Sequence, residues 1–118
     1  MPSPESFFAG HPDGLAVYHA VAEVVAALGD SQVRVTRSQI AFRRRKGFAW
    51  VWRPGKYVTS TVPAVLSIAL PREDGSGRFK QVVHPSPRVW MHHLELRSPG
   101  EVDPEVTCWL REAWTAAE

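Results

Sequence analysis

Apolar residues recur at helical spacing near both ends of the chain and at a spacing of two between them. In residues 13–28 the apolar positions lie three or four apart, which is typical of a helix with a buried face. Pro12 suits the first turn of that helix, and Gly29 suits its C-terminal cap. In residues 104–117 the apolar positions again share one stripe, and Asp103 is placed to cap the N-terminus. The pattern predicts a helix at each end of the domain.

Between these helices apolar positions alternate with polar ones, which predicts strands. Basic, Pro-Gly and Gly-Ser-Gly turns divide residues 33–96 into about five such strands. Residues 48–52 should place three aromatic side chains on one face, Pro63 should mark an edge, a bulge or a break, and residues 74–77 should form a hairpin tip. The expected fold is α+β: an N-terminal helix, an antiparallel β-meander, and a C-terminal helix packed on one sheet face.

Length and composition indicate a single folded unit. The chain has 118 residues, of which 44% are hydrophobic and 22% charged, as in ordinary globular domains. Residues 12–118 are predicted to form that one domain. Residues 1–11 contain two prolines and are predicted to be a tail, anchored by Phe7 and Phe8.

Segments that would target the chain to a membrane are not expected. No apolar run approaches the roughly 20 residues that a membrane span requires, and the first residues lack the basic and apolar regions of a signal peptide. The single cysteine, Cys108, has no partner for a disulfide, which agrees with a reducing compartment. We therefore expect a cytoplasmic protein without a membrane partner.

The charges are segregated along the chain, although the formal net charge is only +2. Residues 31–72 contain nine basic side chains and no acidic one. Cations next to a Trp-rich strand combine groups that meet phosphates with rings that stack on bases. The leading hypothesis is a non-enzymatic binding module whose basic, aromatic sheet surface meets an anionic partner, such as nucleic acid or an acidic protein surface. Its candidate cations are Arg43, Arg44, Arg45, Lys46, Arg53 and Lys56.

Aromatic residues in the predicted sheet leave further interpretations open. A basic segment followed by aromatic residues is also typical of a solvated turn above a row of aromatic side chains that face the core. It also describes a homodimer whose outward aromatic residues form the interface. A third alternative is an enzyme that binds a small molecule in a pocket lined by tryptophan and histidine. The candidate stacking or pocket residues are Trp50, Trp52, Trp90 and His92.

Residue types used in metal binding and catalysis are present, but their spacing favours neither. His92 and His93 are adjacent on a strand and should point to opposite sheet faces, and no His-Glu-x-x-His motif occurs. Cys108 has no activating base near it in sequence, and no Gly-x-Ser-x-Gly turn is present. We expect no metal site, no cofactor and no catalytic residue.

Several stretches of the chain together match one pattern. They are residues 7–28, residues 33–42, Phe48-Ala49 with the turn Pro54-Gly55-Lys56, residues 93–96 and residues 102–114. On these stretches the chain resembles domain of unknown function 5655, a family of small bacterial domains, over nearly its whole length. The resemblance implies an uncharacterised, stand-alone, bacterial version of a module that is also fused to larger proteins, including ones with restriction-type or transport-labelled regions. It implies no activity.

Overall fold

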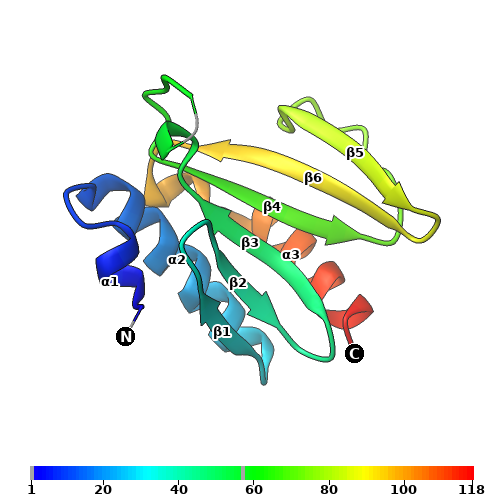
Figure 1. Ribbon diagram of the computed structural model, residues 1–118. Helices are drawn as coiled ribbons and strands as arrows, with labels where there is room; N and C mark the ends of the chain where they lie inside the picture. Colours follow the sequence, from blue (N-terminus) through cyan, green and yellow to red (C-terminus); the bar gives the residue numbers. More distant parts are fainter. Residues whose placement is uncertain (1, 57) are drawn as a thin grey trace.

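A six-stranded antiparallel sheet carries two long helices on one face, as Figure 1 shows for the computed structural model, which describes residues 2–56 and 58–118. The α-helices are α1 (Pro4–Phe7), α2 (Pro12–Leu28) and α3 (Pro104–Ala116). Two short 3₁₀ helices are η1 (Pro54–Lys56) and η2 (Pro99–Glu101). The strands are β1 (Gln32–Val35), β2 (Ile40–Arg43), β3 (Gly47–Trp52), β4 (Ala64–Leu70), β5 (Gln81–Ser86) and β6 (Val89–Leu96).

The strand order β1-β2-β3-β4-β6-β5 confirms the α+β class and corrects the predicted connections. The sheet has six strands instead of about five, and β6 lies between β4 and β5. β4 pairs antiparallel with β6 over its whole length, from Ala64 opposite Leu96 to Leu70 opposite Trp90. Residues 74–77 are therefore not a hairpin tip, because the strands on either side of this loop are not neighbours. The meander pattern holds only from β1 to β4.

The start of α3 and the end of α2 lie where their predicted capping residues place them. In α3 the side chain of Asp103 accepts a hydrogen bond from the backbone N–H of Val106 at 3.1 Å. Helix α2 ends at Gly29, whose φ of 144° lies in a region that favours glycine. A Cβ atom on Gly29 would lie 2.6 Å from the indole of Trp114, so this glycine also permits a close approach between the end of α2 and α3.

The core lies between the helices and one face of the sheet. Helix α2 contributes a row of buried valines, and α3 contributes Val106, Trp109, Leu110 and Ala113. The strands contribute alternate residues, such as Leu66 opposite Leu94, because side chains on a strand point to opposite faces in turn. Figure 1 shows no helix over the other face, which we call the open face.

The segment predicted to be an N-terminal tail takes part in this core. Residues 4–7 form helix α1, which Ser3 and Ser6 close with reciprocal capping hydrogen bonds. Phe8 is only 2% exposed and belongs to the hydrophobic core. Its ring lies so near Gly14 of α2 that a Cβ on that glycine would be 2.5 Å away.

A register shift in the β2–β3 pair alters which faces the aromatic side chains of residues 48–52 occupy. Phe42 pairs with Ala49 and Arg43 pairs with Gly47, so Phe48 has no opposite residue. Phe48 and Ala49 are both buried in the core cluster, whereas Trp50 and Trp52 are half-buried. The prediction that all three aromatic side chains share one face is therefore wrong, because the bulge interrupts the alternation at Phe48.

Candidate functional site

The open face carries a row of side chains that crosses four strands. Trp50 on β3 lies opposite Ser67 on β4, Ser67 lies opposite His93 on β6, and His93 lies opposite Gln81 on β5. Paired residues in a sheet point to the same face, so these four share the face that no helix covers. Trp52 is two residues after Trp50 and lies on this face as well.

A chain of hydrogen bonds fixes the centre of the open face. The indole Nε1–H of Trp52 donates to Ser67 Oγ at 2.9 Å, and Ser67 Oγ lies 2.7 Å from Nδ1 of His93. The Trp52 and His93 rings meet edge to face, with centroids 6.2 Å apart and an angle of 88° between their planes. The Trp52 ring is thereby held over the sheet instead of projecting freely into solvent.

Burial controls the charge of His93. Desolvation lowers the pKa of His93 below its ordinary value of 6.5, and the neighbouring His92 adds to this effect. The imidazole is therefore neutral at pH 7. Since Ser67 Oγ already accepts from Trp52, its own hydroxyl hydrogen is available for Nδ1 of a neutral His93.

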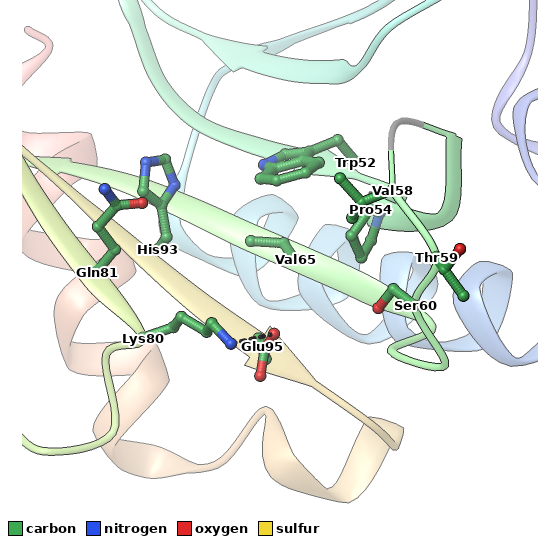
Figure 2. Close-up of a pocket in the computed structure, with 10 residues that line it drawn as sticks. All are labelled: Trp52, Pro54, Val58, Thr59, Ser60, Val65, Lys80, Gln81, His93 and Glu95. Atoms are coloured by element: carbon green, nitrogen blue, oxygen red, sulfur yellow. Dashed lines mark ion pairs between the residues drawn. The ribbon is translucent and has the colours of Figure 1, made fainter.

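Two hollows flank the Trp52–His93 pair. The larger, with a volume of about 550 Å³, is called here the open-face groove. As Figure 2 shows, its lining residues are Trp52, Pro54, Val58, Thr59, Ser60, Val65, Lys80, Gln81, His93 and Glu95. A second hollow of about 470 Å³, on the side toward Trp50 and Met91, shares Trp52 and His93 with it. Both volumes lie in the range of small-molecule sites.

The open-face groove combines an apolar wall with a polar wall. Trp52, Pro54 and Val65 form the apolar side, and Gln81 and His93 supply hydrogen-bonding groups. The two charged side chains that line the groove, Lys80 and Glu95, form an ion pair at 3.6 Å. The groove is therefore close to neutral overall, so shape, stacking and hydrogen bonds decide what it can hold.

Comparison with known proteins identifies the family but no characterised relative. The family model of Domain of unknown function (DUF5655) matches residues 5–117, nearly the whole chain. The chain belongs to the DUF5655 family. Searches of curated proteins and of solved structures found no significant match to this DUF5655 domain.

In the described part of the chain, none of the helices combines the length and the apolar character that crossing a membrane requires. Residues 2–56 and 58–118 contain no cluster of three or more histidine, cysteine, aspartate or glutamate side chains able to hold a metal ion.

Only two of the four predicted stacking residues lie on the open face of the DUF5655 domain. Trp50 and Trp52 do, but Trp90 and His92 alternate onto the face that the helices cover. The ring of Trp90 stacks on His84, with centroids 3.8 Å apart. His92 is 0% exposed, so it cannot line a surface pocket.

Hydrogen bonds explain the burial of His92. Its Nε2 accepts from the backbone N–H of Asp74 at 2.9 Å, and its Nδ1 lies 2.9 Å from the carbonyl oxygen of Trp90. Because Nε2 accepts, Nδ1 carries the hydrogen and donates. The histidine that contacts Trp52 on the open face is instead His93, which is not among the four predicted stacking residues. The alternation of residues 89–96 already separated the two histidines, but it did not indicate which one faced the helices.

The six candidate cations fall into two groups at opposite ends of β3, a strand about 20 Å long. In the β2–β3 turn, Arg44 donates from Nη1 to the carbonyl oxygen of Trp114 at 2.9 Å, while Arg45 and Lys46 are exposed. Beyond the other end of β3, the ammonium of Lys56 donates to the carbonyl of Arg37. The structure therefore does not gather all six cations and the tryptophans into one surface, although Lys46 and Trp50 line one hollow at the β2–β3 end of the sheet.

Proposed function

We propose that this DUF5655 domain is a non-enzymatic binding module whose open-face groove holds a planar nitrogen heterocycle of the nucleobase type. The observation that carries the proposal is the Trp52 ring, which its hydrogen bond to Ser67 holds over the sheet at the wall of a 550 Å³ groove. This proposal keeps the predicted role of the aromatic side chains in binding. The predicted role of the basic side chains receives less support.

Stacking on Trp52 is the main source of affinity in this proposal. A base stacked on an aromatic side chain contributes about 1–3 kcal/mol. The indole is already oriented by Ser67 and His93, so little side-chain freedom is lost when a ring binds. His93 and Gln81 on the polar wall provide donors and acceptors for the edge of a heterocycle.

Charge plays a small part in this recognition. The ion pair between Lys80 and Glu95 leaves the groove without a free cation for a phosphate, and the β2–β3 turn lies at the far end of β3 from the groove. Binding of an oligonucleotide through a single stacked base should therefore depend weakly on salt. A nucleoside without a phosphate should bind nearly as well.

The arrangement of Ser67 and His93 supports binding over catalysis. Their hydrogen bond has the length of a nucleophile–base contact. However, Ser67 is 4% exposed in the middle of β4 and accepts from Trp52. Among the hydrogen bonds of the described residues, no carboxylate orients the His93 ring. The pair is suited to holding Trp52 in place.

Isothermal titration with adenosine, thymidine and a short single-stranded oligonucleotide tests the proposal. Trp52→Leu should weaken binding roughly tenfold or more, the equivalent of one lost stacking contact. Trp90→Leu is the matched control, because it removes a half-buried indole that lies outside the groove, and it should bind as the wild type does. Saturable binding of nucleosides would point to a free heterocycle, and binding of the oligonucleotide alone would point to nucleic acid.

Two results would overturn the proposal. One is the absence of saturable binding for every nucleoside and oligonucleotide at millimolar concentration. The other is an equal loss of affinity in the Trp52→Leu and Trp90→Leu proteins. In the second case the loss of affinity would reflect a general destabilisation of the domain, because the two tryptophans lie on different faces of the sheet.

A further inference from the structure

Three hollows follow one another along β3. The open-face groove lies at the Trp52 end of the strand, and the second hollow, of about 470 Å³, shares Trp52 and His93 with it. A third hollow, of about 420 Å³, shares Trp50 with the second and reaches Gly47, where β3 begins. We call it the end hollow, because residues of α3 line it as well and place it at the end of the sheet. Since each hollow shares an aromatic side chain with the next, the three form a continuous path along the strand.

Trp50 and Trp52 are spaced to hold two separate rings. They are alternate residues of β3, so they point to the same face and their Cα atoms lie about 7 Å apart. Bases that stack on each other are only about 3.4 Å apart along a nucleic-acid strand. Two bases that stack on these two indoles therefore cannot stay stacked on each other. They must come from an unpaired strand whose bases are splayed out.

The Trp50 ring lies against the start of its own strand. A Cβ atom on Gly47 would be 2.7 Å from this ring, so the glycine lets the indole lie over the backbone. Trp50 is half-buried, and it lines both the second hollow and the end hollow. The chain thus supports one part of the ring while the rest faces the hollows, which suits a platform for stacking.

Two cations lie at the far end of this path. Lys46 precedes β3 and Arg88 precedes β6. Both strands pair antiparallel with β4, so they run in the same direction and both cations lie at the same end of the sheet (Figure 1). Both side chains are exposed and line the end hollow, and neither takes part in an ion pair between described residues. Their charges are therefore available to phosphate groups.

Negative groups oppose these cations only weakly. Among the described residues, no aspartate or glutamate lines the second hollow or the end hollow, and Glu118 lies outside both linings. The C-terminal end of α3 closes the end hollow, and the negative end of a helix dipole disfavours an anion. However, Arg44 donates to the carbonyl oxygen of Trp114, and the N–H of Arg45 donates to that of Ala117. The side chains that line the end hollow are therefore net positive, and part of the opposing dipole is neutralised.

We propose that the three hollows form one binding track for single-stranded nucleic acid, in which Trp52 and Trp50 stack on successive bases and Lys46 and Arg88 contact phosphates beyond them. This inference rests on the function proposed for the open-face groove, and it names the partner. A strand uses the whole track, because only a strand joins several bases to phosphates. At about 7 Å for each base, a track as long as β3, about 20 Å, holds about three nucleotides.

The test is isothermal titration of the full chain with thymidine and with thymidylates of two, three and four residues. The dinucleotide should bind about fivefold or more tightly than thymidine, because its second base stacks on Trp50. Between about 50 and 200 mM salt the tetranucleotide should lose about sevenfold in affinity, as expected when a protein neutralises two phosphates of a single strand. Tetramers of deoxyuridylate and uridylate differ only in the 2′-hydroxyl, so comparing them shows whether the track prefers DNA, prefers RNA or accepts both.

Two variants separate stacking from charge. Trp50→Leu should remove the gain from thymidine to the dinucleotide, and Trp90→Leu is its control, because that half-buried indole lies on the other face of the sheet. Lys46→Gln combined with Arg88→Gln should remove the salt dependence of the tetranucleotide. These two side chains are exposed, so this variant tests the track even if Trp50→Leu does not fold. Arg97→Gln is the matched control for charge, since Arg97 is exposed beyond the other end of β6, a strand about 27 Å long, and it should bind as the wild type does.

Failure of the track can be told apart from failure of the groove. If thymidine binds and affinity does not rise with oligonucleotide length, the groove stands and the track is wrong. A gain with length that neither Trp50→Leu nor the double glutamine variant reduces would place the rest of the strand on another surface. Equal affinity for a duplex would also overturn the track, because paired bases cannot reach the indoles. If neither thymidine nor any oligonucleotide binds, the groove and the track are both wrong.

Discussion

Replacing Arg44 with methionine separates two roles for the basic β2–β3 turn. Nη1 of Arg44 donates to the carbonyl oxygen of Trp114 at 2.9 Å, and the guanidinium carbon lies 3.6 Å from the centre of the Trp114 ring. Trp114 is in the last turn of α3, where carbonyl groups lack the usual i+4 partner, and its carbonyl oxygen also accepts from the N–H of Ala117 at 3.3 Å. Methionine keeps most of the side-chain stem but removes the charge and the donors, so Arg44→Met should lower the free energy of unfolding.

The expected loss can be estimated from the contacts. A hydrogen bond from a charged donor contributes about 1.5–3 kcal/mol, and a cation at a helix C-terminus about 0.3–1 kcal/mol. The cation–π contact adds about 0.5–1 kcal/mol. These contributions overlap and methionine recovers some packing, so the net loss should be about 2 kcal/mol. For a domain of this length, that loss lowers Tm by about 8 °C.

Urea denaturation followed by far-ultraviolet circular dichroism measures this loss, with Arg45→Met as the control. The side chain of Arg45 is exposed, and its backbone N–H, which bonds the carbonyl of Ala117, is unaffected by the substitution. The control should stay within about 0.5 kcal/mol of the wild type. Equal stabilities for the two variants would refute the capping argument and would leave Arg44 available as a surface cation.

Three further substitutions test other parts of the structure. Because burial lowers the pKa of His93, the unfolded chain takes up a proton at this histidine before the folded chain does as pH falls through about 6.5. The contribution of neutral His93 to the free energy of unfolding is therefore present above that pH and is lost below it. In urea denaturation, His93→Gln should lose less stability than the wild type between about pH 7.5 and 5.5. Asp103→Ala removes the cap of α3 and should cost about 1–2 kcal/mol in thermal denaturation, whereas Asp103→Asn should recover part of that loss. Gly14→Ala places a methyl 2.5 Å from the Phe8 ring and 2.8 Å from the Pro63 carbonyl oxygen, so Tm should fall by several degrees; a rise would show that both neighbours move freely.

Local signals predicted the two long helices, but they did not predict α1 or the pairing of strands that are distant in the chain. The capping of α3 by Asp103 and the end of α2 at Gly29 depend on neighbouring residues only, so both could be predicted from the sequence. The position of β6 depends on pairing residues 64–70 with residues 90–96 across an intervening strand. The prolines near Ser86 mark a turn in either arrangement, so they could not distinguish a meander from the observed order.

The candidate site was predictable only in part for a similar reason. Alternation placed Trp50 and Trp52 together, but the face they occupy depends on which side the helices cover. The same alternation separated His92 from His93, and only the three-dimensional contacts show that Asp74 holds the first in the core while Ser67 holds the second beside Trp52.

The outer strands of the sheet differ in what they offer to a second copy of the chain. On β5, Pro85 has no N–H and the register shifts between Val83 and Ser86, which interrupts the row of donors that strand addition requires. On β1, Gln32–Val35 contains no proline, and Val33 is 49% exposed. A homodimer formed by antiparallel strand addition would therefore join through β1. Its two-fold axis would stand perpendicular to the sheet and bring both open-face grooves onto the same side of one continuous sheet.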